Sequence, residues 1–295
     1  MSTAPRKIRF GTEIPARVYA ETRILPPERA RCLANVVVGP ARKSRTQTVV
    51  DIGCGTGRIL AGLVQLRGVE VIGVDITEAM LRAVPAWALE TGCCRLILRD
   101  CRAGVVPTPG TADVALVHWV FNTTEDWRSI LEYAVRCIRP SGRVAWFEER
   151  GTLYDAIDGR LAVVPESWSS MELEFWRLWY RALGDHGEAP QLEKRPGLPI
   201  QSGAPAALLE SVGYSIERDR EREERWDRYV SLHWIVQRVL VARAFTNLWQ
   251  IPDAVYWRAV RAVQDYLARY RSAESPQVRL RFVSTPVTAV RRDVN

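Results

Sequence analysis

The sequence predicts a parallel α/β fold, and three observations lead to that prediction. Strand-like and helix-like segments alternate from residue 47 to residue 150. A glycine-rich turn, Gly53 to Gly57, follows the first of these strands, and acidic residues stand at or near the ends of the first three. Because the carboxyl ends of parallel strands meet at one edge of a sheet, these features are expected to converge there on a ligand.

The alternating half of the chain is expected to contain short apolar strands and helices with apolar residues at helical spacing. Thr77 is expected at the N-cap of the second helix, and Pro85 is expected to kink that helix. The expected elements are a strand at Thr48–Gly53, a helix at Arg58–Leu66, a strand at Val69–Asp75, a helix at Thr77–Glu90, strands at Arg95–Arg99 and Ala112–His118, a helix at Glu125–Ile138 and a strand at Arg143–Glu149.

Beyond residue 150 the regular alternation stops. The expected elements are a helix at Ser167–Leu183, a helix at 204–212, a strand at Tyr214–Arg222, helices at Asp227–Leu248 and Asp253–Arg271, and a strand at Val278–Val290. We therefore divide the sequence into an N-terminal arm (1–45), a core (46–150), a helical insertion (151–203) and a C-terminal part (204–295) that completes the sheet, all within one domain.

Composition and charge exclude several classes of protein. With 47% hydrophobic and 25% charged residues, the 295-residue chain is neither disordered, collagen-like nor a coiled coil. Its net charge of +7 arises within residues 1–45, which hold ten basic and three acidic residues, whereas the other 250 residues together carry no net charge. The body of the protein therefore lacks the basic excess of a nucleic-acid-binding domain.

The six cysteines show no C-x-x-C spacing, and His186 and His233 are isolated, so no metal site is expected. The sequence has no signal-peptide pattern and no apolar run of about 18 residues, the length that crosses a membrane. We therefore expect a cytoplasmic protein with no membrane partner. Its oligomeric state is left open.

The sharpest motif is VVDIGCGTGR, from Val49 to Arg58, in which an acid precedes three alternating glycines. Glycines allow backbone to pass close to a ligand. The spacing does not fit the G-x-G-x-x-G of dinucleotide-binding turns. Asp51 would also sit unfavourably beside a phosphate, whereas it suits an ammonium group.

Two further acids stand at strand ends. Asp75 closes the second strand, where a carboxylate accepts hydrogen bonds from both hydroxyls of a ribose. Asp100 follows the third strand and could accept from the exocyclic amine of an adenine. Together with Asp51, these acids suggest an adenosine whose 5′ substituent carries an amino acid.

These motifs resemble those of class I S-adenosylmethionine-dependent methyltransferases, in the branch that acts on small natural products. DIGCGTG is similar to the family's first motif, Gly73–Leu81 to its second, and Ile138–Gly142 to the loop before its fifth strand. Tyr19 to Pro26 is similar to a Y-x-x-T-R-x-x-P segment that precedes the fold. The resemblance implies a Rossmann-like seven-stranded sheet in the order 3-2-1-4-5-7-6, with helical cap insertions.

The resemblance also implies the cofactor, S-adenosyl-L-methionine, and the residues around it. Asp51 would hold the methionine amino group above the backbone of the glycine turn, Asp75 the ribose, and Asp100 with Cys101 the adenine edge. The arm would close over the cofactor entrance. The expected cofactor residues are Tyr19, Arg23, Asp51, Gly53, Cys54, Gly55, Asp75, Ile76, Met80, Asp100, Cys101, His118 and Trp119. For Ile76 and Met80, ordinary core packing is the alternative.

Methyl transfer needs a base only when the acceptor is a poor nucleophile. By resemblance to natural-product O-methyltransferases, the position of the general base is Asn122, which cannot accept a proton. His118, Glu148 and Glu149 are therefore the candidate catalytic residues, and a solvated position at the rim is the alternative for the two glutamates.

Aromatic residues of the helical insertion suggest a lid over an apolar or aromatic acceptor. The expected substrate residues are Asn122, Trp168, Glu172, Phe175, Trp176 and Trp179, with packing against the C-terminal helices as the alternative for the tryptophans. The sequence thus predicts methyl transfer to a small molecule. An RNA or protein methyltransferase, a protein that binds the cofactor without turnover, and a dehydrogenase stay open as rivals.

Overall fold

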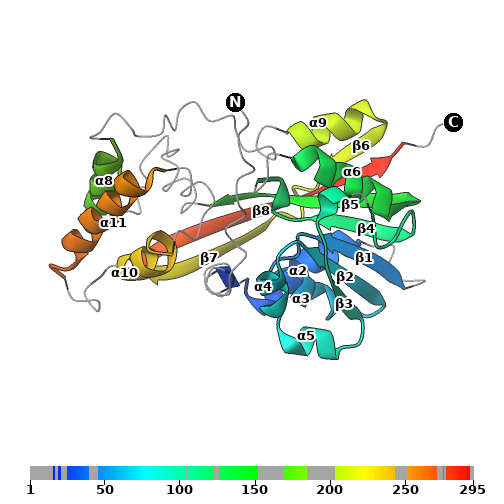
Figure 1. The fold of residues 1–295 in the computed structure, drawn as a ribbon, viewed down its shortest axis with the longest axis horizontal. Helices are drawn as coiled ribbons and strands as arrows, with labels where there is room; N and C mark the ends of the chain where they lie inside the picture. Colours follow the sequence, from blue (N-terminus) through cyan, green and yellow to red (C-terminus); the bar gives the residue numbers. More distant parts are fainter. Residues whose placement is uncertain are drawn as a thin grey trace. The chain divides into compact units, whose positions relative to one another are not determined.

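A computed structural model of the chain contains one mixed sheet flanked by helices (Figure 1). The structure describes residues 16, 19–20, 25–39, 46–103, 105–122, 126–151, 169–184, 203–242, 251–270, 275 and 277–292. Within these residues the sheet has the order β3-β2-β1-β4-β5-β8-β6, and β7 pairs with β8. The strands are β1 (Gln47–Ile52), β2 (Val69–Asp75), β3 (Cys94–Leu98), β4 (Ala112–Val117), β5 (Ile138–Gly151), β6 (Tyr214–Arg218), β7 (Glu224–Ser231) and β8 (Gln277–Arg291).

The expected strand order is confirmed, with β8 in the place of the seventh strand and β6 in the place of the sixth. Strands β1 to β5 pair in parallel, so their carboxyl ends lie along one edge, whereas β6 runs antiparallel to β8. Strands β1 and β4 are central and buried along nearly their whole length, which explains their continuous apolar sequences.

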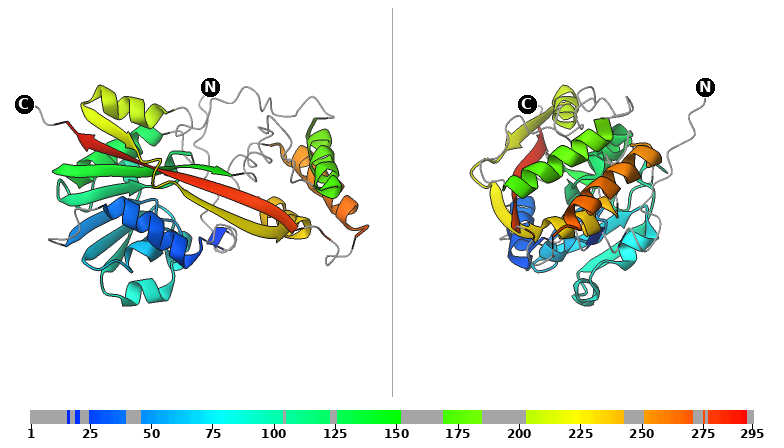
Figure 2. Two further views of the ribbon diagram at one scale, coloured as in Figure 1. Left: turned by 180° about the vertical axis from the view of Figure 1, so that it is seen from behind. Right: turned by 90° about the vertical axis from the view of Figure 1, so that its left-hand side faces the viewer.

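Helices cover both faces of the parallel part of the sheet. One face packs on α6 and α9 in a single apolar core that includes Trp146 and Tyr133, both at most 2% exposed. The opposite face carries α2 and α3, which pack on each other (Figures 1 and 2). The helices are α2 (Pro27–Val38), α3 (Leu60–Leu63), α4 (Glu78–Arg82), α5 (Ala86–Glu90), α6 (Trp127–Cys137), α8 (Ser170–Gly184), α9 (Ala204–Ser211), α10 (Leu232–Ile235) and α11 (Asp253–Leu267), together with a π-helical turn at Val236–Leu240.

Two expected helices differ from the structure. The helix expected at Thr77–Glu90 is divided into α4 and α5, because Pro85 has no N–H and its ring obstructs a continuous helix. Thr77 occupies the N-cap position of α4, but its side chain makes no capping hydrogen bond. The start of the helix expected at Asp227–Leu248 is wrong, because the chain continues as strand β7 to Ser231.

Strand β7 is explained by its partners on β8. Trp226 stacks on Phe282 with ring centroids 5.3 Å apart, and Arg279 donates to Asp227. Side chains on the two strands therefore stabilise an extended segment, and this tertiary contribution outweighs the local helical pattern.

The chain divides into two compact units. The first unit comprises Met1–Glu148, Gly197–Glu224 and Thr285–Asn295, and the second comprises Glu149–Pro196 and Arg225–Ser284. The parallel strand ends belong to the first unit. Helices α8, α10 and α11 belong to the second, in which α8 and α11 run side by side (Figure 2).

Candidate functional site

The glycine turn after β1 is held against the end of β2. The N–H groups of Gly53 and Cys54 both donate to the carbonyl oxygen of Val74, at 2.7 and 3.0 Å. The Gly55 N–H donates to Oδ2 of Asp75 at 2.9 Å. All three glycines of the turn have positive φ angles: Gly53 at 68°, Gly55 at 54° and Gly57 at 79°. The motif and the acid of the second strand therefore form one hydrogen-bonded unit, which a residue with a Cβ would strain.

The glycines differ in what lies next to them. A Cβ on Gly53 would lie 2.0 Å from Cγ2 of Val120, so a side chain of the protein itself requires glycine at this position. A Cβ on Gly55 would meet nothing nearer than 4.0 Å, where the Gly53 oxygen and Cε1 of Tyr19 stand. Sequence reasoning attributed both glycines to a ligand and missed Val120, whereas the space above Gly55 is bordered by Tyr19.

Asp51 and Asp75 place two buried carboxyl groups at neighbouring strand ends. Asp51 is 2% exposed, and burial together with the charge of Asp75 raises its pKa to about 7. Burial also raises the pKa of Asp75, although amide hydrogen bonds from Thr77 and Gly55 oppose the shift. Among the described residues no basic side chain pairs with Asp51, so the site suits a ligand that brings a positive charge.

Asp75 is fixed at the end of β2 by several hydrogen bonds. Its Oδ1 accepts from the Thr77 N–H at 2.8 Å and its Oδ2 from the Gly55 N–H. The Thr77 hydroxyl and the Ile76 N–H also hydrogen-bond to this carboxylate. A carboxylate has about four lone-pair sites, so hydroxyl groups of a ligand would share or replace some of these contacts.

Asp100 is engaged by a residue that sequence reasoning missed. Arg102 donates to both of its carboxylate oxygens, with Nε to Oδ1 at 2.8 Å and Nη2 to Oδ2 at 2.6 Å, and its guanidinium lowers the pKa of Asp100. Cys101 is buried, and burial raises the pKa of its thiol to about 12. An adenine at this position would share the Asp100 carboxylate with Arg102.

Three other expected cofactor residues lie near the end of β2. Met80 is buried against Ala16 in a small cluster on which Tyr19 packs, so its environment is that of a core residue. Ile76 is 40% exposed and offers an apolar face to solvent. Cys54 is buried, and burial raises the pKa of its thiol.

The end of β4 brings together His118 and an arginine of the glycine motif. Nη1 of Arg58 lies 3.4 Å from Nε2 of His118. Because a guanidinium can only donate, Nε2 is the acceptor and the ring proton is on Nδ1. The imidazole also packs edge-on against Phe147, at 5.4 Å between centroids. Arg58 follows the third glycine directly, and that position is the signal that could have identified it.

Trp119 is the described non-glycine residue with a positive φ angle, 65°. This conformation is unfavourable for a bulky side chain and is maintained here only because the surrounding structure fixes it. The short 3-10 helix Val120–Asn122 follows directly and places Val120 over Gly53. The strained turn therefore belongs to the same edge as Asp51 and His118.

The structure describes the remaining expected site residues only in part. Glu148 accepts from Nε of Arg218 at 3.1 Å. The backbones of Asn122 and Glu149 are described, but their side chains are not, and Arg23 and Trp168 lie outside the described residues.

Helix α8 carries the other expected substrate residues in the second unit. Phe175, Trp176 and Trp179 are at most 2% exposed, and Trp179 packs edge-on against Tyr256 of α11 at 5.8 Å. Glu172 is 4% exposed, and burial raises its pKa to about 7. These side chains contribute to the packing of α8 within its unit.

Neither a metal cluster nor a membrane span is found in the part of the chain that the structure describes. No three His, Cys, Asp or Glu side chains there are grouped so that they could hold a metal ion. No described helix is both long enough and apolar enough to cross a membrane.

Comparisons with known proteins find similarity in the part of the chain that forms the parallel strands. Residues 49–142 match a family model described as a methyltransferase domain. The ubiquinone biosynthesis O-methyltransferase of Leptothrix cholodnii is 32% identical over 98 residues, which cover 32% of this chain and 41% of that protein. The enzyme of the same name from Pseudomonas paraeruginosa is 33% identical over 101 residues, or 33% of this chain and 42% of that protein.

The matched segment thus spans less than half the length of these curated relatives. A solved structure from Anaeromyxobacter dehalogenans, provisionally named a type II methyltransferase, has a TM-score of 0.50 and 18% identity, covering 91% of this chain and 97% of that one. It supports the fold alone. The family model and the curated relatives show that residues 49–142 are similar to a methyltransferase domain, and together with the strand order they support a class I S-adenosylmethionine-dependent methyltransferase.

Proposed function

We propose that this protein transfers a methyl group from S-adenosylmethionine to a small, apolar or aromatic acceptor and releases S-adenosylhomocysteine. The observation that carries the proposal is the pair of buried acids at the ends of β1 and β2, joined to the glycine turn by the Gly55–Asp75 hydrogen bond. A cofactor with an amino acid at one end of a nucleoside matches this pair.

The residues of the first unit would hold the cofactor as follows. Asp51 receives the ammonium group, whose charge favours the ionised form of this carboxyl. Asp75 accepts from the two ribose hydroxyls, which share its carboxylate with Gly55 and Thr77. Tyr19 borders the space above Gly55, and Ile76 offers an apolar surface to the adenosine.

When bound, the cofactor supplies a methyl group on a positively charged sulfur. The chemistry that it would supply is an in-line displacement by the acceptor, in which the electron pair of the carbon–sulfur bond stays on sulfur. The contribution of the protein is to align the two reactants and to exclude water. His118, Trp119 and Phe147 would form the apolar and aromatic end of the site beside β4, where aromatic faces stabilise a sulfonium.

His118 and Glu148 are the described candidates for removing a proton from the acceptor. Nε2 of His118 accepts from Arg58, and Glu148 accepts from Arg218, so each candidate base already has a basic neighbour. We therefore assign His118 a positioning role, and an acceptor that ionises easily, such as a phenol, fits best.

The curated relatives support the proposal that the acceptor is a small molecule. The curated proteins that match residues of the core are named ubiquinone biosynthesis O-methyltransferases, a name that implies a small molecule methylated on oxygen.

The test is to titrate the protein with S-adenosylhomocysteine by calorimetry and then to measure its release from S-adenosylmethionine with phenols, RNA and protein as acceptors. Asp75→Asn should weaken cofactor binding at least tenfold, because an amide accepts hydrogen bonds from a ribose less strongly than a carboxylate. Glu78→Gln, an exposed acid paired with Arg82 on α4, is the matched control and should bind normally.

Two of the rivals have their own result in this experiment. Tight cofactor binding without product from any acceptor indicates a binding protein. Product from RNA or protein alone overturns the small-molecule assignment. Equal affinity of Asp75→Asn and the unaltered protein contradicts the ribose role of Asp75.

A further inference from the structure

Arg102 places a positive charge beside the acid that follows the third strand. Its Nε and Nη2 donate to Oδ1 and Oδ2 of Asp100 at 2.8 and 2.6 Å, and its own backbone N–H donates to Oδ1 at 2.9 Å. A carboxylate has about four lone-pair sites. The Asp100 carboxylate is therefore already engaged by three donors of one residue, and a nucleobase there would meet the Asp100–Arg102 pair and not an acid alone.

The pair lies next to the position proposed for the ribose. Asp75 stands opposite Leu98 in the parallel pairing of β2 with β3, and the Arg99 N–H donates to the Asp75 carbonyl oxygen at 2.8 Å. Asp100 is thus the next residue after a backbone hydrogen bond to Asp75. Ile76, which is 40% exposed, adds apolar surface after the end of β2. On the proposed function, in which Asp75 holds the ribose, the base of the same nucleoside lies beside the pair.

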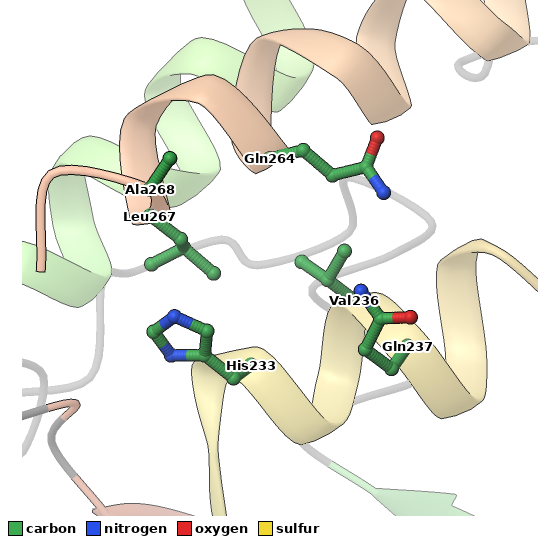
Figure 3. Close-up of a pocket in the computed structure, with 6 residues that line it drawn as sticks. All are labelled: His233, Val236, Gln237, Gln264, Leu267 and Ala268. Atoms are coloured by element: carbon green, nitrogen blue, oxygen red, sulfur yellow. The ribbon is translucent and has the colours of Figure 1, made fainter. Parts of the chain in front are cut away.

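Both side chains of the pair are accessible to a ligand. The side chains of Asp100 and Arg102 are 34% and 42% exposed. The hollow in the second unit that Figure 3 shows differs in this respect, because Val236 and Leu267, which line it, are each only 2% exposed. An exposed ion pair contributes little to stability, so its two groups can turn towards a ligand at low cost.

An acid and an arginine side by side match the edges of two different purines. Adenine presents an amine, which donates, beside a ring nitrogen that accepts. Hypoxanthine presents a carbonyl group, which accepts, beside a ring N–H that donates. Since a carboxylate only accepts and a guanidinium only donates, the pair complements both groups of either base. An acid without the arginine would accept from the adenine amine and would repel the hypoxanthine carbonyl at the same place.

We propose that Arg102 sets the base specificity of the cofactor site, so that the site binds a purine nucleoside with a carbonyl group in place of the adenine amine as well as the adenosine of the cofactor. With adenine, Asp100 accepts from the amine and Arg102 donates to the ring nitrogen. With hypoxanthine, Arg102 donates to the carbonyl and Asp100 accepts from the ring N–H. This inference rests on the proposed function and adds to it a specificity-determining residue.

The test measures, by calorimetry with the full-length protein, the binding of S-adenosylhomocysteine and of S-inosylhomocysteine, its analogue with hypoxanthine in place of adenine. The unaltered protein should bind the two compounds with dissociation constants within about fivefold of each other. Arg102→Met keeps a side chain of similar reach without a donor, and the backbone N–H at this position still holds Asp100. This variant should bind S-adenosylhomocysteine at least as tightly but S-inosylhomocysteine about tenfold more weakly, because a charge-assisted hydrogen bond is lost.

Two further variants separate the choice of base from other effects. Arg102→Lys keeps a charged donor without the planar fork of the guanidinium, so it should bind S-inosylhomocysteine more tightly than Arg102→Met does. Arg222→Gln removes another exposed arginine, one that pairs with Asp219 three residues before it. It is the matched control and should leave both affinities unchanged.

The inference is overturned if S-adenosylhomocysteine binds and the ratio of the two dissociation constants is the same in Arg102→Met as in the unaltered protein. It is also overturned if the unaltered protein binds S-inosylhomocysteine more than about a hundredfold more weakly than S-adenosylhomocysteine, or if Arg102→Met weakens both compounds equally. Failure of both compounds to bind the unaltered protein is a distinct result, which contradicts the proposed function and this inference with it.

Discussion

Asp51 is the residue whose environment departs furthest from that of an ordinary carboxyl group. It is 2% exposed, lies near the second buried acid Asp75, and has no basic partner among the described residues. A carboxyl group in such surroundings opposes folding when it is ionised. The presence of Asp51 at a buried position is explained if a cationic ligand neutralises its charge, because a ligand that binds only the folded state stabilises that state.

We therefore expect Asp51 to make stability depend on pH. Its pKa is about 7 in the folded state and about 3.8 in the unfolded state, so the folded state binds the proton more tightly and stability falls as pH rises from about 4 to about 7. Asp51→Asn lacks this titration and should be more stable than the unaltered protein at pH 8 by on the order of 4 kcal/mol. Urea denaturation of both proteins across this range measures the difference.

The difference between the two proteins should shrink towards pH 4, where Asp51 is protonated in the folded state and begins to be protonated in the unfolded state as well. A constant difference at all pH values would show that the substitution acts through packing and not through charge.

Trp119 gives a second prediction at the scale of one residue. At its φ of 65° a Cβ is unfavourable, so Trp119→Gly should be more stable than Trp119→Ala by about 1 kcal/mol. Comparing the two variants cancels the loss of the indole ring. Trp257, within α11, is the matched control, because the alanine variant there should be the more stable by about 1 kcal/mol. The same order at both positions would contradict the strain at Trp119.

At the scale of elements, the close approach of α3 to α2 depends on Gly62. A Cβ at this position would lie 2.2 Å from the carbonyl oxygen of Ala30, an atom of the α2 backbone that cannot move by rotating a side chain. Gly62→Ala should therefore destabilise the protein by about 2 kcal/mol or more, since the two helices must separate.

Gly184, in the last turn of α8, is the control for this change. A Cβ there would meet nothing within 4 Å, so Gly184→Ala should leave the midpoint of urea denaturation nearly unchanged. If both alanine variants were equally stable, α2 and α3 would not be in contact at Gly62.

The elements also show which parts of the fold sequence patterns could predict. Buried strands such as β1 and β2 have apolar sequences that predict a strand without reference to distant residues, and both were predicted within one residue at each end. Strand β7 was missed because Trp226 and Asp227 are stabilised in an extended form by partners on β8, about 50 residues later in the chain.

The same distinction applies to the site. Asp51, Asp75 and the glycines follow from a short motif and from strand ends, and the structure brings them together. Arg102 on Asp100 and Val120 on Gly53 depend on side-chain placement after the strands end, which no spacing rule specifies. The bases suggested at His118 and Glu148 proved to have basic neighbours for the same reason.

At the scale of the whole molecule, the distribution of charge separates a small-molecule enzyme from one that acts on a polymer. Ten of the 41 basic residues lie in residues 1–45 with three acids, and the remaining 250 residues have equal numbers of both signs. The described ion pairs, such as Arg139–Asp113 and Arg279–Asp227, are consistent with a body in which charges are balanced locally.

Binding to nucleic acid should accordingly be weak at ordinary salt concentrations. A protein that contacts 6–10 phosphates loses about 10³ to 10⁵ in affinity between 50 and 200 mM salt, whereas binding of a small cofactor at buried acids should change less than about threefold. Fluorescence anisotropy with a labelled single-stranded RNA, beside calorimetry with S-adenosylhomocysteine, measures both slopes. A chain that lacks residues 1–15, and with them three basic residues and one acid, should lose any residual RNA affinity first, because those residues carry +2 of the net charge. Tight RNA binding at 200 mM salt that survives this truncation would place the polymer on the body of the protein and would contradict a small-molecule acceptor.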